Sequence, residues 1–488
     1  MLIYKHMHIL PRLLLALLLI LPPPAVLPQS SFDDLPNLGD ASGQVISPKQ
    51  DKELGAYFMR QIRQAGMVLD DPETTTYLQA MGHKLAIHSE NPGYGFTFFL
   101  VNESSINAFA GPGGYIGANI GLFLAAESES ELAGVMAHEI AHVTQRHLAR
   151  AFQAQERMSL PTTAAIIAAI IIGATADPAA GAAAMTAASA AGIQSQINFT
   201  RANEKEADRV GIQTLAAANY DPFGMPAFFE RLQKNSKLYG TRPPEFLSTH
   251  PVTSNRISEA TARAETFPKV KKYTSLDFFL LQAKLRVNNF ANPKQVLADT
   301  RRYEGKSGGK TVTEQYEFAL LLARNEKYNE ALPIMQKLHK NDPDRITYRL
   351  ALGRILSDAN QTREALDLYK NTLDLYPGEI MVIQPYATTL MAAGKSGKAY
   401  SLLSEISDNN DPEPQIYKLL AQAAGATDHK VQTHTAMSQY YFLNGYTNQA
   451  IEQLKLAEKS PSLSSYETAR IQARIANLEA LLRAERQE

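Results

Sequence analysis

The sequence predicts a mainly α-helical protein in two parts: an α+β domain with a small sheet, then a solenoid of paired helices. Two observations carry this prediction. The string His138-Glu139-Ile140-Ala141-His142 lies inside a run of apolar residues with helical spacing. After residue 312, small residues recur with a period of 34 residues. At 488 residues the chain is too long for one domain, so we expect the two patterns to belong to separate domains.

The N-terminus has the pattern of an export signal. An apolar run over residues 13–21 is flanked by Lys5 and Arg12 and is ended by three prolines. This run is too short to span a bilayer comfortably. We therefore expect a signal peptide over residues 1–29 and an exported protein, with an uncleaved membrane anchor as the alternative.

Two strands are expected ahead of the His-Glu string. Residues 96–101 and 115–119 have the composition of strands, and the glycine-rich residues 111–114 form a turn between them. We expect the second strand to lie at the edge of its sheet, where an extended peptide could add by main-chain hydrogen bonds. A small structural hairpin is the alternative.

The string itself is expected on a long capped helix. Ser128 and Glu131 have the spacing of a capping box, and the apolar pattern continues to Arg150, which predicts a helix of about six turns. His147 lies nine residues after His138, so it should point to the far side of that helix and be structural.

The spacing of the two histidines is typical of a metal site. His138 and His142 are four residues apart and share one helix face, so their imidazoles can bind one ion. Glu139 sits beside the same position and can reach a water on that ion, as in the HExxH motif of zinc peptidases. The alternative is a pair of buried core histidines with a surface glutamate between them.

A third ligand is expected on a later helix. Glu204 and Asp208 are four residues apart and would share a helix face, whereas Glu206 would point about 200° away from Glu204. Glu204 could bind the metal while Asp208 orients a histidine ring. On spacing alone, a solvated acidic helix face is the alternative.

Taken together, these motifs resemble the family of integral-membrane and periplasmic zinc endopeptidases typified by the HtpX heat-shock protease and the CAAX prenyl protease. The resemblance covers about residues 48–265. It implies a zincin-type metallopeptidase domain with one Zn²⁺ per chain, held by His138, His142 and Glu204, with Glu139 and Asp208 as catalytic residues. It is carried by the HExxH string, by Glu204-x-x-x-Asp208, and by Asn107-Ala108-Phe109-Ala110, Gly113-Gly114-Tyr115-Ile116, Gly121-Leu122 and Glu131-Leu132.

A loop histidine is a further candidate. His250 precedes Pro251, so it should lie in an extended or turn segment that could fold over the metal. It could take the open coordination position in a resting state, or it could stabilise the oxyanion as a donor. A local hydrogen bond is the third interpretation. Arg256 is expected to form a structural salt bridge rather than to assist catalysis.

The interval between the metal ligands is unusually apolar. Residues 161–199 form two alanine-rich halves, each shorter than the ~20 residues that a membrane span requires. We expect either a buried pair of helices or a helical hairpin that covers the active site or contacts a membrane surface peripherally.

The 34-residue period predicts tetratricopeptide repeats. Ala331, Ala365 and Ala399 are in register, as are Pro343 and Pro377, which is the pattern of small residues at helix crossings and prolines at closing turns. Three clear units cover about 312–411, with degenerate units near 278–305 and 433–462. We therefore expect a metallopeptidase domain over 30–270 and a repeat domain over 271–488.

The whole architecture resembles periplasmic proteases of Gram-negative bacteria that control the quality of outer-membrane proteins. That resemblance implies clients that are unfolded or stalled outer-membrane proteins, a chaperone-like role, and docking of the repeats onto the barrel-assembly machinery. A chaperone or scaffold with rare proteolysis is one alternative, and a protease for lipid-linked or prenylated peptides is another. The net charge of −1 gives no electrostatic case for nucleic acid, and the absence of cysteine excludes thiolate ligands.

Overall fold

The computed structural model describes residues 47–152, 163, 167–169, 201–239, 245–270, 273–303, 310–409, 413–461 and 463–486. All of them belong to one compact unit, Val45–Glu488. The expected signal peptide lies outside the described residues, as does most of the apolar segment 161–199. Of that segment, residues 163 and 167–169 are described, and they are helical. Among the described helices, none combines the length and the apolar character that crossing a membrane demands.

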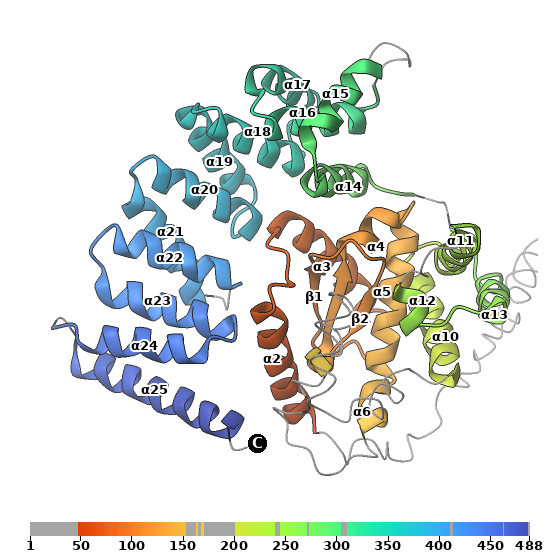
Figure 1. The fold of residues 1–488 in the computed structure, drawn as a ribbon, viewed down its shortest axis with the longest axis horizontal. Coiled ribbons are helices and arrows are strands. Elements are labelled where there is room, and N and C mark those ends of the chain that lie inside the picture. The colour runs from red at the N-terminus through yellow and green to blue at the C-terminus, as the bar shows by residue number, and fades with distance from the viewer. Residues whose placement is uncertain are drawn as a thin grey trace, which may run out of the picture. The chain divides into compact units, whose positions relative to one another are not determined.

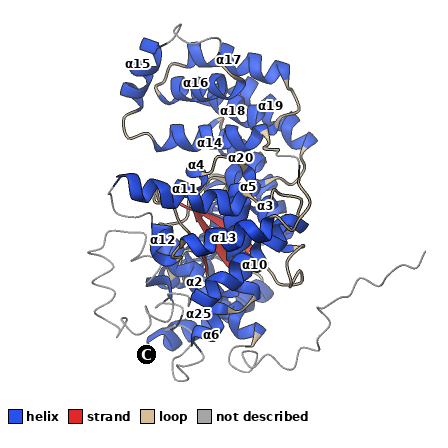
Figure 2. Ribbon diagram, turned by 90° about the vertical axis from the view of Figure 1, so that its right-hand side faces the viewer, coloured by secondary structure: helices blue, strands red, loops and turns tan. Residues whose placement is uncertain are grey.

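The first part of the chain combines a small sheet with surrounding helices (Figure 1). Figure 2 shows how little of the fold is strand (red) compared with helix (blue). The elements in chain order are α2 (Pro48–Gln64), α3 (Pro72–Ala86), β1 (Thr97–Val101), β2 (Ala108–Ala110), the 3₁₀ helix η2 (Pro112–Gly114), β3 (Tyr115–Asn119), α4 (Ile120–Ala125), α5 (Glu129–Thr144), α6 (His147–Phe152), α10 (Arg201–Ala217), α11 (Gly224–Tyr239), α12 (Glu245–Thr249) and α13 (Ser254–Ala264).

The sheet has three strands in the order β1-β3-β2. β1 pairs with β3 in parallel, and β2 pairs with β3 antiparallel, with Phe109 opposite Gly117. Both predicted strands are present, but the prediction that residues 115–119 form an edge strand was wrong, because β3 is central. The two outer strands are β1 and β2, and β2 was not predicted because three residues are too few to show an alternating pattern.

Helix α5 is the buried centre of this part. Its apolar residues, such as Leu132 and Met136, are fully buried against residues of β1, β3 and α11. Gly211 lets α10 approach closely, since a Cβ there would lie 3.1 Å from the backbone nitrogen of His138. Close packing of α10 on α5 brings the acidic face of α10 against the histidine-bearing face of α5.

The predicted six-turn helix is broken. Ser128 caps α5 as expected, accepting a hydrogen bond from the Glu131 nitrogen. The carboxylate of Glu131, however, accepts from the Glu127 nitrogen and from Arg231, so the expected capping box does not form. α5 ends at Thr144, and Arg146 has a left-handed φ of 53°, after which α6 starts in a new direction.

The second part consists of paired helices with the predicted repeat. α16, α18 and α20 begin 34 residues apart, and so do their partners α17, α19 and α21, which confirms the solenoid. The helices are α14 (Leu276–Asn289), α15 (Pro293–Tyr303), α16 (Val312–Arg324), α17 (Tyr328–Asn341), α18 (Ile346–Asp358), α19 (Thr362–Leu375), α20 (Ile380–Ala392), α21 (Ser396–Asn409), α22 (Pro414–Gly425), α23 (Lys430–Leu443), α24 (Thr447–Glu458) and α25 (Ser465–Arg486).

The first repeat helix, α14, belongs to two cores. Phe278 and Leu281 pack in the core around α5, while Leu280 and Ala283 pack in the core of the repeats. Gln282 donates to the carbonyl oxygens at the end of α4, at 2.8 and 2.7 Å. The two parts of the chain are therefore joined by a shared helix rather than by a linker alone.

Carboxylates at the start of α5 and at the start of α3 also bind residues of α14 or its N-cap. Glu129, in the first turn of α5, accepts hydrogen bonds from the backbone nitrogen and hydroxyl of Ser275, the N-cap of α14, at 2.8 and 2.7 Å. Lys284 lies 2.6 Å from Asp71 and 2.7 Å from Glu73, both buried at the start of α3. Burial raises the pKa of Glu73, whereas Lys284 and Thr74 outweigh burial at Asp71 and lower its pKa.

Replacing Lys284 should destabilise this junction. A Lys284→Met variant leaves two buried carboxylates without a cation, so we expect a loss of about 3–5 kcal/mol in the free energy of unfolding, measured by urea titration. Arg286→Met on the same helix is the matched control. Arg286 pairs with Glu317 while 43% of its side chain is exposed, so its loss should cost less than about 1 kcal/mol. Equal losses in the two variants would contradict the assigned role of Lys284.

Candidate metal centre

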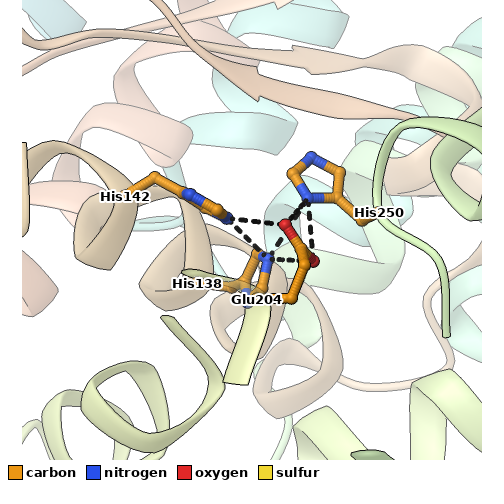
Figure 3. Close-up of side chains that lie close together, drawn as sticks. All are labelled: His138, His142, Glu204 and His250. Carbon is orange, nitrogen blue, oxygen red and sulfur yellow. Dashed lines mark hydrogen bonds and ion pairs between the residues drawn. The ribbon is translucent and has the colours of Figure 1, made fainter. Parts of the chain in front are cut away.

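Four buried side chains from separate elements meet at one point (Figure 3). His138 and His142 come from α5, Glu204 comes from the first turn of α10, and His250 follows α12. One donor atom of each residue lies within 4.8 Å of the others, and all four side chains are almost fully buried. The three residues predicted as ligands are therefore brought together, and the loop histidine joins them.

The distances between these donors fit a tetrahedral site. His138 Nε2 lies 3.0 Å from His142 Nε2 and 3.4 Å from His250 Nδ1. The Glu204 oxygens lie 3.1 Å from His250 Nδ1 and 3.5 Å from the Nε2 atoms of the other two histidines. Ligands about 2.1 Å from a tetrahedral ion are about 3.4 Å apart. Three nitrogens and one oxygen are also a donor set that zinc accepts.

Glu139 is buried beside the cluster. Its side chain is fully buried, and neither carboxylate oxygen makes a hydrogen bond of ordinary geometry among the described residues, although the backbone of Ala110 is close enough to lower its pKa slightly. The Nε2 atom of His250 lies 3.6 Å from Oε1 of Glu139. Burial raises the pKa of this carboxyl group. The nearby His250 and His138 lower it, but by less than burial raises it. A buried acceptor left open in this way suits a residue whose partner is a water or a substrate.

Asp208 and Arg256 contact the donor residues His138 and Glu204 from outside the donor cluster. Asp208 Oδ1 lies 3.0 Å from His138 Nδ1, the distance expected of a carboxylate that orients a metal-binding ring. Arg256 donates to both oxygens of Asp208, at 2.7 and 2.8 Å, and lies 2.7 Å from Glu204. Burial alone would raise the pKa of Asp208, but the hydrogen bonds from Arg256 and His138 hold it below its ordinary value.

The segment that carries His250 is fixed at two places. The Phe246 ring stacks on the His250 ring with a centroid separation of 4.9 Å. Glu245 accepts hydrogen bonds from Ser105 and Asn107, each at 3.0 Å, which ties α12 to the loop ahead of β2. The position of His250 thus depends on contacts that lie outside the donor cluster.

Sequence analysis missed two residues at this centre. His147 does not point to the far side of α5, because the helix is interrupted at Arg146. Its Nδ1 lies 2.7 Å from Nδ1 of His142, and its Nε2 lies 3.1 Å from Glu206. Burial lowers the pKa of His147 to about 4. No glycine or proline marks the break in the sequence, so no local signal predicted it.

Comparison with known proteins gives concordant results. The profile of peptidase family M48 matches residues 72–264, and a tetratricopeptide repeat profile matches residues 356–423. The beta-barrel assembly-enhancing protease of Escherichia coli (strain K12) is 35% identical over 92% of each chain. The protease of the same name from Yersinia pestis is 34% identical over 92% of each chain. A mitochondrial metalloendopeptidase OMA1 of Arabidopsis thaliana is 30% identical over 39% of this chain and 36% of its own.

The stability of the metal-free chain should depend on pH through His138. Burial would lower the pKa of His138, but hydrogen bonds to Asp208 and Glu204 outweigh it and raise the pKa to about 9. The folded chain then binds this proton more tightly than the unfolded chain, whose histidine pKa is about 6.5. This stabilisation is complete below about pH 6.5 and is lost as pH rises to about 9. We expect the unfolding temperature of chelator-treated protein to fall across that window.

Asp208→Asn tests whether Asp208 causes this pH dependence, because it removes the carboxylate charge that favours the protonated ring of His138. This variant should flatten the pH dependence, as measured by differential scanning fluorimetry. An unfolding temperature that rises between pH 6.5 and 9 in the unaltered metal-free chain would contradict the assignment.

Proposed function

The chain belongs to peptidase family M48 and is a metallopeptidase, and we propose that it is a zinc-dependent endopeptidase of the periplasm. Its proposed substrates are misassembled or stalled outer-membrane proteins. The observation that carries the proposal is the set of four buried donors beside the open carboxylate of Glu139. The compartment and the substrate class are supported by the names of the similar proteases, which refer to beta-barrel assembly.

The proposed reaction assigns each residue of the centre a role. Zinc, when bound to His138, His142 and Glu204, supplies a Lewis acid that polarises the scissile carbonyl and lowers the pKa of a water towards about 7. Glu139 takes the proton of the attacking water and delivers it to the leaving amine. The raised pKa of Glu139 suits this exchange, because a base works best when its pKa lies near the operating pH.

The geometry supports the resting-state role of His250. Its Nδ1 lies at ligand-to-ligand distance from both His138 and Glu204, where the fourth corner of a tetrahedron falls. A catalytic zinc site keeps that corner open for water or substrate. We therefore take the structure to be a closed state, in which His250 must leave before a peptide can react. An oxyanion donor would instead need to face the substrate and not the other ligands.

The edge strand β2 is the proposed place for the peptide. β2 pairs with β3 on one side, lies against α5, and is one of the two end strands of the sheet in the described part of the chain. The outer side of the other end strand, β1, is hydrogen-bonded to residues 67–69. An extended peptide that adds to β2 would be held through its main chain, which does not depend on its side chains. Such binding suits unfolded clients of varied sequence.

A second candidate function is a chaperone or scaffold with rare proteolysis. The solenoid from α14 to α25 favours it, because stacked repeats present an extended surface for proteins. We propose that this surface docks on the barrel-assembly machinery. We also propose that the chain divides into a signal peptide over 1–29, a peptidase domain over 30–270 and repeats over 271–488.

Glu139→Gln separates the two functions. The amide cannot accept the proton, so hydrolysis of an unfolded protein such as casein should fall by about 10²–10⁴-fold while one Zn²⁺ per chain is retained. Metal content is measured by mass spectrometry and cleavage by gel. Activity at the unaltered rate would refute the proposed base. If assistance to outer-membrane protein assembly survives in this variant, the chain performs both functions.

His250→Ala tests the closed state. Removing the fourth donor should leave zinc on three ligands and raise the rate of casein cleavage several-fold, because the open position no longer has to be vacated. An oxyanion role predicts the opposite, a loss of about 10²–10³-fold. His429→Ala, at the N-terminus of α23 in the repeats, is the matched control and should leave cleavage unchanged. Unchanged turnover of His250→Ala would reject both functional roles.

A further inference from the structure

The break after α5 places a second imidazole against a metal-facing histidine. In an unbroken helix, His147 would lie about 140° round the axis from His142, and the two rings could not touch. The left-handed φ of Arg146 interrupts the helix, and the ring centroids of His142 and His147 are 4.8 Å apart. His147 is fully buried and starts α6.

The contact between the two rings fixes where their hydrogens lie. It joins Nδ1 to Nδ1 at 2.7 Å, so only one of these atoms can carry a hydrogen. Nε2 of His142 faces the donor cluster, 3.0 Å from Nε2 of His138, and must present its lone pair to a cation. The hydrogen of His142 is then on Nδ1 and is donated to His147.

The same reasoning continues to the surface. With its Nδ1 accepting, neutral His147 carries its hydrogen on Nε2, which lies 3.1 Å from Oε2 of Glu206. Arg150 lies 3.1 Å from the same oxygen. His142, His147 and Glu206 thus form a chain of hydrogen bonds. Glu206 sets the tautomer of His147, and His147 sets the tautomer of His142.

We propose that His147 is a positioning residue of the metal centre. It holds His142 as the Nδ1–H tautomer with Nε2 directed at the cation, and Glu206 holds His147 in turn. The two metal-facing histidines therefore have unlike supports: His138 contacts the buried carboxylate of Asp208 directly, whereas His142 contacts a neutral ring whose own carboxylate is 32% exposed. The inference rests on the metal centre proposed above, but not on its substrate.

Zinc affinity of the full chain tests the proposal, measured by competition with a chromophoric chelator. His147→Leu keeps a similar volume but removes the acceptor, so the Kd should rise about 10–100-fold. His147→Asn places an amide oxygen near the position of Nδ1 and should restore most of the affinity. Lys205→Met is the matched control. Lys205 lies on α10 between Glu204 and Glu206 and pairs with Glu259 at the surface, so its loss should leave the Kd unchanged.

A spectroscopic measurement keeps the test decisive if His147→Leu does not fold. In zinc-loaded protein with ¹⁵N-labelled histidine, the ring of His142 should carry its hydrogen on Nδ1, and that signal should shift in His147→Asn. A hydrogen on Nε2 of His142 would overturn the proposal. So would a folded His147→Leu with unchanged Kd, or an Asn variant as weak as the Leu variant. If the unaltered chain binds no zinc, the metal centre itself is refuted.

Discussion

The metal centre depends on the buried guanidinium of Arg256. α10 brings two carboxylates, Glu204 and Asp208, into the interior on one helix face, where they would repel each other. Arg256 contacts both, so one cation neutralises the group that would bind metal and the group that orients His138. Their charges in turn raise the pKa of Arg256. Removing one partner of such a buried group leaves an uncompensated charge, so the arrangement is fixed as a unit.

The contacts of Arg256 with Glu204 and Asp208 also explain why α10 and the segment from His250 to Arg256 act together. Arg256 lies in the first turn of α13 and follows His250 closely in sequence, so the segment that supplies the fourth donor also supplies the cation. α5 supplies the two neighbouring histidines and Glu139. Three short stretches of chain are enough to build the centre once α10 packs on α5 and α13 packs on α10.

Sequence reasoning succeeded where structure follows from local periodicity. The spacing of His138 and His142, the Ser128 cap and the 34-residue repeat are all set by helix geometry, which a single sequence displays. Glu204 was found by spacing together with family resemblance. The failures share another cause. The strand β2 pairs with β3, and the turn at Arg146 is accompanied by contacts of His147 and Arg150 with Glu206 on α10, so both depend on contacts between elements.

The missed helix break had the largest consequence for the site. His147 was assigned to the wrong direction because a straight helix was assumed, whereas Glu206 does point away from the donor cluster but its contact with His147 was not predicted. Each residue faces the other across two helices, which no spacing within one helix could show. Residues that support a ligand from a neighbouring element are therefore the part of a metal site that a single sequence reveals least.

The carboxylate of Glu129 gives the fold a mechanical property. It lies in the first turn of α5 and also binds the N-cap of α14, so the N-terminal ends of these two helices meet on one anionic group. A displacement of α14 therefore strains these bonds or moves the helix that carries His138 and His142. Glu129 thus couples the position of the first repeat helix to that of the metal-facing histidines.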